Sequence, residues 1–311
     1  MKSKGLVYAC LSSLGVGAMI PVGKVALESV SPPTLLFYMM LFGSVYLGVI
    51  TGIQGKGGKS DRSPAFWKFE KYLFFQSLVS FVAVWLFWTG TRRLDPTVAA
   101  FLSRTELILT IFFAIVILKE RLRPSDISAL LLVLLGLILI KFPFSFDGHQ
   151  EPEPVSGLGF CLILMSSLCF ALCELIAKVA APKYHPIDFA FRRSMLLTLF
   201  FGLSLLVIER EILVPPTKIL FWIALAAVCG PVMGRSFYMA ALRHLKLSSA
   251  AIVLQTQPIF VAIFAFLLLG QIPGLWQWIG GIVIIGGCLI SVSKRKDAEE
   301  TVGLEIHHQD P

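Results

Sequence analysis

Long apolar stretches, separated by short polar segments, constrain this chain more than any other feature. The hydrocarbon core of a bilayer is about 30 Å thick, and a helix needs roughly 20 apolar residues to cross it. Because backbone polar groups in lipid must be satisfied within the segment, each stretch is predicted to be an α-helix. The predicted spans cover residues 5–27, 34–53, 71–91, 97–118, 125–142, 156–180, 187–208, 217–241, 248–269 and 274–293. We therefore expect an all-α integral membrane protein with ten transmembrane helices.

The composition agrees with a membrane protein and argues against several other classes. Hydrophobic residues make up 56% of the 311 residues and charged residues only 15%, against roughly 25% charged in soluble domains. The net charge of +8 comes mostly from loop residues, so a nucleic-acid partner is not expected. Cys169 and Cys173 share a helix face, but no further ligand accompanies them at metal-binding spacing. We expect no metal and no cofactor.

Loop charges predict the orientation, because cytoplasmic loops retain Lys and Arg. The first run is long for the apolar part of a secretory signal, so we take it as a span with a cytoplasmic N-terminus. Arg92 and Arg93 are exceptions that Asp95 partly offsets. The protein is expected in the cell (inner or plasma) membrane, with both termini and a disordered tail, 296–311, in the cytoplasm. The basic residues of the predicted cytoplasmic loops are Lys56, Lys59, Arg62, Lys68, Lys71, Lys119, Arg121, Arg123, Lys178, Lys183, Arg243, Lys246, Lys294, Arg295 and Lys296.

An internal repeat divides the chain into two halves, residues 1–145 and 155–295, of five spans each. An offset of 154 aligns Ser12-Ser13-Leu14 with Ser166-Ser167-Leu168, and an offset of 151 aligns the later parts. Five is an odd number, so the second half must enter the membrane from the opposite side. Such inverted repeats are typical of secondary transporters, whose substrate lies between the halves near the membrane centre. Other matched pairs are Lys24/Lys178, Pro32/Pro186, Phe37/Phe191, Gly48/Gly202, Thr105/Thr256 and Gly136/Gly287.

The segment from Leu94 to Arg121, with Lys-Glu-Arg-Leu at 119–122, has an echo in the segment from Leu245 to Ile272. With the two five-helix halves, it resembles the drug/metabolite transporter superfamily, specifically its ten-helix EamA-type branch. The resemblance implies a secondary transporter that exports or exchanges a small polar or amphipathic metabolite, amino-acid-like or an organic anion, by alternating access. The chain departs from the family pattern at Met39, Leu107 and Gln271, which argues against strict functional symmetry of the halves.

Polar residues in the fourth and ninth spans are the first candidates for a substrate pathway, because ionisable groups inside a membrane are costly. Arg104 and Glu106 lie about halfway along the fourth span, and the repeat superposes them on Gln255 and Gln257. Residues two apart on a helix point roughly 200° apart, so Arg104 and Glu106 are not expected to face the same side. A charge pair that joins helices is the alternative interpretation.

Aromatic residues and a proline add weaker signals. Tyr238 and Trp88 are candidate walls of the substrate pathway, although aromatic residues also anchor helices at the interface. Pro21 would loosen the first helix, since a proline frees a backbone carbonyl.

A second group of charges, Glu174, Arg193 and Arg235, is a candidate gate or coupling site. The neighbouring Arg192 is instead expected to extend its side chain to the membrane–water interface. If protons are the coupling ion, Glu106 or Glu174 would carry them, and exchange without protons is equally compatible. The partners we expect are a small-molecule substrate and the lipid bilayer, and both a monomer and a homodimer remain open.

Two other function classes remain as alternatives. A membrane receptor or scaffold has no need of an inverted repeat with central polar pairs. An intramembrane enzyme would need a catalytic motif such as His-Glu-x-x-His, and the sequence has none. We therefore expect a transporter and not an enzyme.

Overall fold

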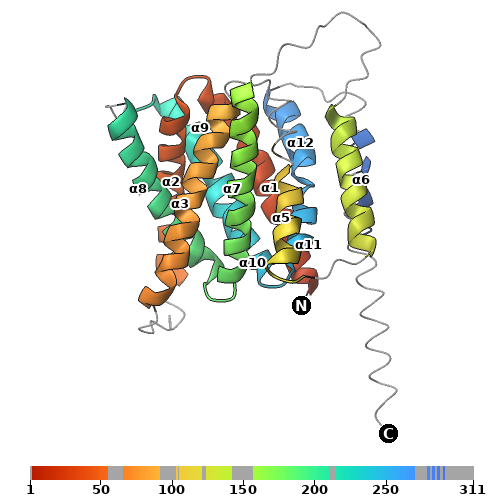
Figure 1. Ribbon diagram of the computed structural model, residues 1–311. Coiled ribbons are helices and arrows are strands. Elements are labelled where there is room, and N and C mark those ends of the chain that lie inside the picture. The colour runs from red at the N-terminus through yellow and green to blue at the C-terminus, as the bar shows by residue number, and fades with distance from the viewer. Residues whose placement is uncertain are drawn as a thin grey trace, which may run out of the picture.

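The computed structural model describes residues 2–54, 66–91, 103, 105–120, 124–141, 157–209 and 214–269, with isolated positions between 279 and 290. These residues form helices whose long axes run roughly side by side, and none of them forms a strand (Figure 1). The helices are α1 (Lys2–Leu27), α2 (Pro32–Gln54), α3 (Phe66–Thr91), α5 (Thr105–Val116), α6 (Pro124–Lys141), α7 (Gly157–Ala180), α8 (Pro186–Ser204), η1 (Leu205–Glu209), α9 (Thr217–Ala227), η2 (Val228–Gly234), α10 (Arg235–Leu242), α11 (Leu247–Leu254) and α12 (Gln257–Leu269).

These helices coincide with the apolar stretches of the sequence. Seven segments of the described part are long and apolar enough to cross a membrane, and α5 is a shorter apolar helix. Helices of this number and composition support a multi-pass membrane protein, and the described residues are all-helical in their regular structure. The predicted tenth span, 274–293, falls almost wholly outside the described residues, as does the predicted tail.

The ninth predicted span is not one continuous helix, which corrects the sequence-based expectation. Helix α11 ends at Leu254, Gln255 and Thr256 form a turn, and α12 begins at Gln257. The cause is Pro258, the second residue of α12. Proline has no backbone N–H that could donate to the Leu254 carbonyl oxygen and so continue the helix, but it fits well in the first turn of a new helix.

The eighth predicted span is also irregular. It consists of α9, the π-helical segment η2 and α10, with Pro231 inside η2. A π-helical bulge accommodates a residue that the regular hydrogen-bond ladder cannot include. Helix α1 continues through Pro21 from Lys2 to Leu27, and the loosening expected there stays a prediction.

Helix α1 packs closely against η2. The Ser12 hydroxyl donates a 2.8 Å hydrogen bond to the Gly234 carbonyl oxygen. A Cβ atom on Gly15 would lie 2.6 Å from the Cys229 carbonyl oxygen, so only glycine allows this approach. Van der Waals packing and hydrogen bonds of this kind hold membrane helices together, since lipid weakens the hydrophobic drive between them.

Helices α2 and α8 pack along one another in opposite directions through a reciprocal contact. A Cβ atom on Gly48 would lie 3.0 Å from the Phe191 ring, and one on Gly202 would lie 3.1 Å from the Phe37 ring. As the residue number rises along α2, the partner's number falls along α8. The same glycine–phenylalanine contact therefore occurs twice, with the roles of α2 and α8 exchanged.

Buried apolar residues gather in two clusters. The α7–α11 cluster joins Leu175 and Ala177 of α7 to Leu247 and Ala250 of α11. It also contains Ala9, Leu73, Ala114, Ala180, Ala181, Tyr184, Phe189, Tyr238, Met239, Ala241, Leu242, Leu245 and Val253. The α2–α9 cluster contains Val22, Ala26, Leu35, Leu36, Tyr38, Met39, Met40, Leu197, Phe201, Ile223, Ala226 and Ala227. Among the described residues, the second cluster includes no buried residue of α5, α11 or α12.

Candidate functional site

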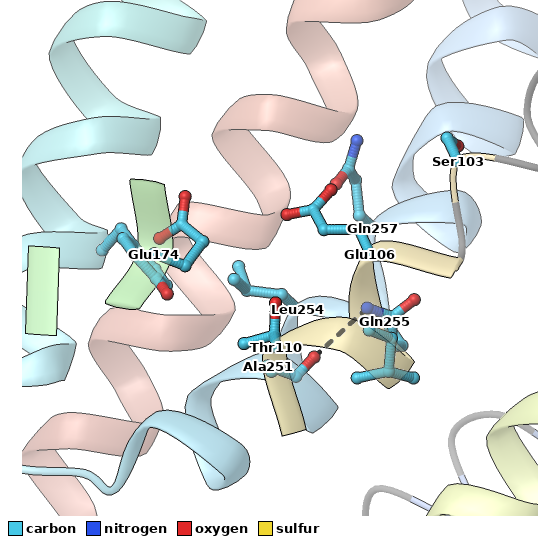
Figure 2. Close-up of a pocket in the computed structure, with 10 residues that line it drawn as sticks. Ser103, Glu106, Thr110, Glu174, Ala251, Leu254, Gln255 and Gln257 are labelled. Atoms are coloured by element: carbon cyan, nitrogen blue, oxygen red, sulfur yellow. Dashed lines mark hydrogen bonds between the residues drawn. The ribbon is translucent and has the colours of Figure 1, made fainter. Parts of the chain in front are cut away.

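A cavity lies where α5, α7, α10, α11 and α12 meet, and most of its lining side chains can form hydrogen bonds (Figure 2). Its volume of about 70 Å³ can hold a few water molecules or one polar end of a larger solute. The apolar lining residues are Leu107, Ala251 and Leu254. The polar ones are Ser103, Glu106, Thr110, Glu174, Tyr238, Gln255 and Gln257. The structure therefore brings together Glu106, Glu174, Tyr238 and both glutamines, which the sequence had singled out separately.

The break between α11 and α12 allows both glutamines to face this cavity. On a continuous helix, residues two apart would point to opposite sides. Here Gln255 follows α11, where its Nε2 atom donates to the Ala251 carbonyl oxygen at 3.2 Å, while Gln257 opens α12 (Figure 2). Between them, the Thr256 hydroxyl lies 2.8 Å from the Ser13 hydroxyl of α1, which ties the break to the first helix.

Glu106 reaches the cavity from the first turn of α5. The helix begins at Thr105, and the Glu106 amide donates to the Ser103 carbonyl oxygen at 3.2 Å. A carboxylate in a first turn is favoured by the partial positive charge at a helix N-terminus. Arg104, its predicted companion, lies outside the described residues.

The Glu174 carboxylate of α7 forms an ion pair with Arg235 of α10. Arg235 Nη1 lies 3.2 Å from Glu174 Oε1, and the two side chains are only 11% and 15% exposed. The guanidinium also stacks near two aromatic rings, 5.4 Å from the Tyr238 centroid and 5.6 Å from that of Phe189. Such cation–π contacts stabilise a charge that has little access to water.

Several buried polar atoms around this ion pair have no hydrogen-bond partner in the described structure. They are Glu174 Oε2, Arg193 Nε, Arg235 Nε and Nη2, Ser236 Oγ and the Tyr238 hydroxyl. Arg193 interacts electrostatically with both members of the ion pair. Unsatisfied buried groups are uncommon in native proteins, so a concentration of them calls for water or a ligand.

Two sequence-based candidates lie elsewhere. Trp88 is not among the described residues that line the cavity, and it packs against the α2–α9 cluster with its ring at 85° to that of Phe87. Its role in a substrate pathway stays a prediction. Arg192, which we expected at the interface, pairs with Asp188 one turn earlier on α8, at 3.1 Å.

The structure adds two charged residues that the pattern of spans did not single out. Both Glu120 carboxylate oxygens accept hydrogen bonds at the start of α11, from the Leu247 amide at 2.8 Å and from the Ser248 amide at 3.2 Å and hydroxyl at 2.7 Å. Lys178 Nζ donates to the Leu242 carbonyl oxygen at 2.7 Å and also to the Leu245 carbonyl oxygen. The sequence signals were the place of Glu120 in the Lys-Glu-Arg-Leu segment and the repeat match of Lys178 with Lys24.

Comparison with known proteins gives consistent results. The model of the EamA-like transporter family matches residues 3–142 and again residues 157–293. An uncharacterized transporter of Clostridium kluyveri is 27% identical over 219 residues, 65% of each chain. The pseudopaline exporter of Pseudomonas aeruginosa is 20% identical over 292 residues, 94% of this chain and 96% of that protein. One crystal structure, 16% identical, superposes with a TM-score of 0.73 over 96% of this chain and 100% of the other, and so shares the fold.

Proposed function

Because the chain belongs to the EamA-like transporter family, we propose that it exports or exchanges a small polar or amphipathic metabolite by alternating access. The observation that carries this proposal is the cavity, which residues of both matched segments line with carboxylate, amide and hydroxyl groups. Such groups can replace the hydration of a polar solute inside the membrane. The exporter name of the Pseudomonas aeruginosa relative supports the outward direction.

The proposal includes ten transmembrane helices in two inverted halves, with both termini in the cytoplasm. The reciprocal contact between α2 and α8 supports the inversion. An approximate two-fold axis between the halves requires each such contact to occur twice, as in a symmetric dimer. The antiparallel course of the two helices supports an axis in the membrane plane, and the two matches to one family model support the division into halves.

The lining of the cavity favours a solute that has both hydrogen-bond donors and hydrogen-bond acceptors. Carboxylates accept, hydroxyls donate or accept, and the two glutamine amides do both. Glu174 already balances the positive charge of Arg235 at 3.2 Å. An amino-acid-like solute, which carries both charges, fits this mixed lining better than a plain organic anion does.

The test begins in cells with and without the protein, whose metabolites are compared inside and in the medium. Solutes that leave the cells only when the protein is present are then tested for uptake into proteoliposomes. We expect at least one solute to pass both tests. If no solute depends on the protein in either system, the proposed transport is wrong.

Proton coupling is tested with Glu106→Gln and Glu174→Gln in proteoliposomes under an imposed pH gradient. The coupling variant loses proton-driven accumulation but retains exchange of the solute, since a neutral amide cannot carry the proton. Asp188→Asn is the control, because it removes a carboxylate that pairs with Arg192 outside the cavity. Proton-dependent flux that is unchanged in both glutamate variants excludes these carboxylates as coupling sites.

A further inference from the structure

Glu120 and Lys178 hold the two ends of one connection, residues 243–246, which joins α10 to α11. Lys178 binds carbonyl oxygens where α10 ends, and Glu120 binds N–H groups where α11 begins. A cation at a helix C-terminus and an anion at an N-terminus are each favoured by the helix dipole. We call this arrangement the 243–246 clamp.

The clamp joins segments that are far apart in the sequence. Glu120 lies 127 residues before Leu247, in the other segment matched by the family model. Lys178 comes from α7, and its ammonium interacts electrostatically with the Glu120 carboxylate. The clamp therefore ties α5, α7, α10 and α11 together, which are four of the five helices that surround the cavity.

The turn that carries Glu120 is itself specific. Lys119 has a φ of 54°, in the left-handed region that residues with a side chain seldom adopt. The Glu120 amide donates to the Ala114 carbonyl oxygen, six residues earlier, at 3.0 Å. This hydrogen bond spans one residue more than that of a Schellman turn, in which the left-handed position is usually a glycine. The chain thus adopts an unfavourable conformation here, and it directs Glu120 towards α11.

The clamp lies on one side of the cavity. Leu247 and Ser248 precede the lining residue Ala251 by about one helical turn. The ends of these helices lie beside the N-terminus in Figure 1, and a Cβ atom on Gly5 would lie 2.8 Å from His244 Cβ. The α7–α11 cluster connects the clamp and the cavity, since it contains Leu247 at the clamp and Tyr238 at the cavity. This side of the cavity is the predicted cytoplasmic side.

On the basis of the proposed function, we propose that the 243–246 clamp is the cytoplasmic gate of the carrier. Its hydrogen bonds form when the cavity is closed towards the cytoplasm and break when it opens. Glu120 and Lys178 are positioning residues that act through α10 and α11 and do not touch the solute. Hydrogen bonds to a charged group are stronger than neutral ones, yet single side-chain contacts of this kind can be made and broken within a transport cycle.

The test measures from which side of the membrane the cavity can be reached. A reporter cysteine replaces Thr110, which lines the cavity, in a chain whose six native cysteines are replaced by serine or alanine. Vesicles of each orientation receive a membrane-impermeant maleimide. We expect Glu120→Ala and Lys178→Met to accelerate labelling from the cytoplasmic face by about tenfold or more, and labelling from the other face to fall. Glu120→Gln, which retains one acceptor oxygen, should lie between wild type and Glu120→Ala.

The opposite changes at the two faces distinguish a gate from a purely structural contact. Loss of a purely structural contact would lower the thermal stability but leave the ratio of the labelling rates at the two faces unchanged. That result would overturn the proposal. Asp188→Asn, the matched control, should leave both rates at the wild-type value. If the reporter chain does not fold, amide hydrogen exchange at residues 247–250 is measured in the otherwise native chain. Exchange there that does not rise in Glu120→Ala also overturns the gate.

The two proposals fail in different ways. If the metabolite comparison identifies a transported solute and the labelling is insensitive to Glu120→Ala, only the gate is wrong. If no solute depends on the protein, the transport function is wrong, and the gate, which rests on it, is wrong as well.

Discussion

Arg235 Nη1 and Glu174 Oε1 lie 3.2 Å apart between α10 and α7, and each side chain keeps at least one further polar atom without a partner. The pair therefore neutralises its charges without using its full hydrogen-bonding capacity. The Glu174 carboxylate faces the cavity together with the Tyr238 hydroxyl, which also has no hydrogen-bond partner. A solute in the cavity can bond to this pair without first breaking it.

Removal of Glu174 should destabilise the protein strongly. Glu174→Gln leaves Arg235 and the neighbouring Arg193 as buried like charges, at a cost of about 3–5 kcal/mol. Combining it with Arg235→Gln should restore part of the loss, because no unpaired charge then remains at that position. Thermal unfolding of the purified single and double variants measures this as a double-mutant cycle. Additive losses would contradict the coupling.

Helix α1 offers a matched pair of glycines for testing its packing. Gly15→Ala places a methyl group 2.6 Å from the Cys229 carbonyl oxygen, so we expect a loss of about 1–3 kcal/mol from overpacking. Gly23→Ala meets no atom within 4 Å and should be neutral or stabilising by about 0.5–1 kcal/mol. Thermal unfolding of both variants checks the difference. Equal effects would show that the α1–η2 contact is looser than described.

Replacing Pro258 tests the role of the break between α11 and α12. Pro258→Ala restores a backbone N–H and permits one continuous helix, on which Gln255 and Gln257 point to opposite sides. We expect transport to fall severalfold while thermal stability is retained. The measurement is initial uptake into proteoliposomes beside a melting curve of the same preparation. Full transport by this variant would mean that one glutamine suffices.

Tyr238 and Trp88 should respond differently to substitution. Tyr238→Phe removes an unpartnered hydroxyl from the cavity wall, and we expect the KM for the solute to rise with little change in stability. Trp88→Phe alters packing against the α2–α9 cluster, so it should lower the melting temperature and leave the KM unchanged. A KM that changes only in Trp88→Phe would place the substrate pathway on the other side of α3.

The sequence predicted the helices well because the thickness of a bilayer imposes their length. Glu106, Gln255 and Gln257 stood out in the sequence as rare polar groups within apolar runs, and all three line the cavity. That they contact a solute stays a prediction. The break at Gln255 and Thr256 was missed, although Pro258 was visible, because prolines are also tolerated inside membrane helices, as Pro21 is. The contact of Glu120 with α11 could not be predicted, since no periodicity links residues 120 and 247.

The close contacts of α1 have a consequence for the synthesis of the protein. Ser12 bonds to a residue 222 positions later, and Ser13 to one 243 positions later. The first helix to leave the ribosome therefore enters lipid long before its partners exist, with two hydroxyl groups and a glycine-lined face unoccupied. Chains that stop before residue 234 lack both partners, and chains that stop before residue 256 lack the partner of Ser13. The nascent chain is therefore incompletely packed during most of its translation. Most of the residues that pack against α1 are translated in the last third of the coding sequence.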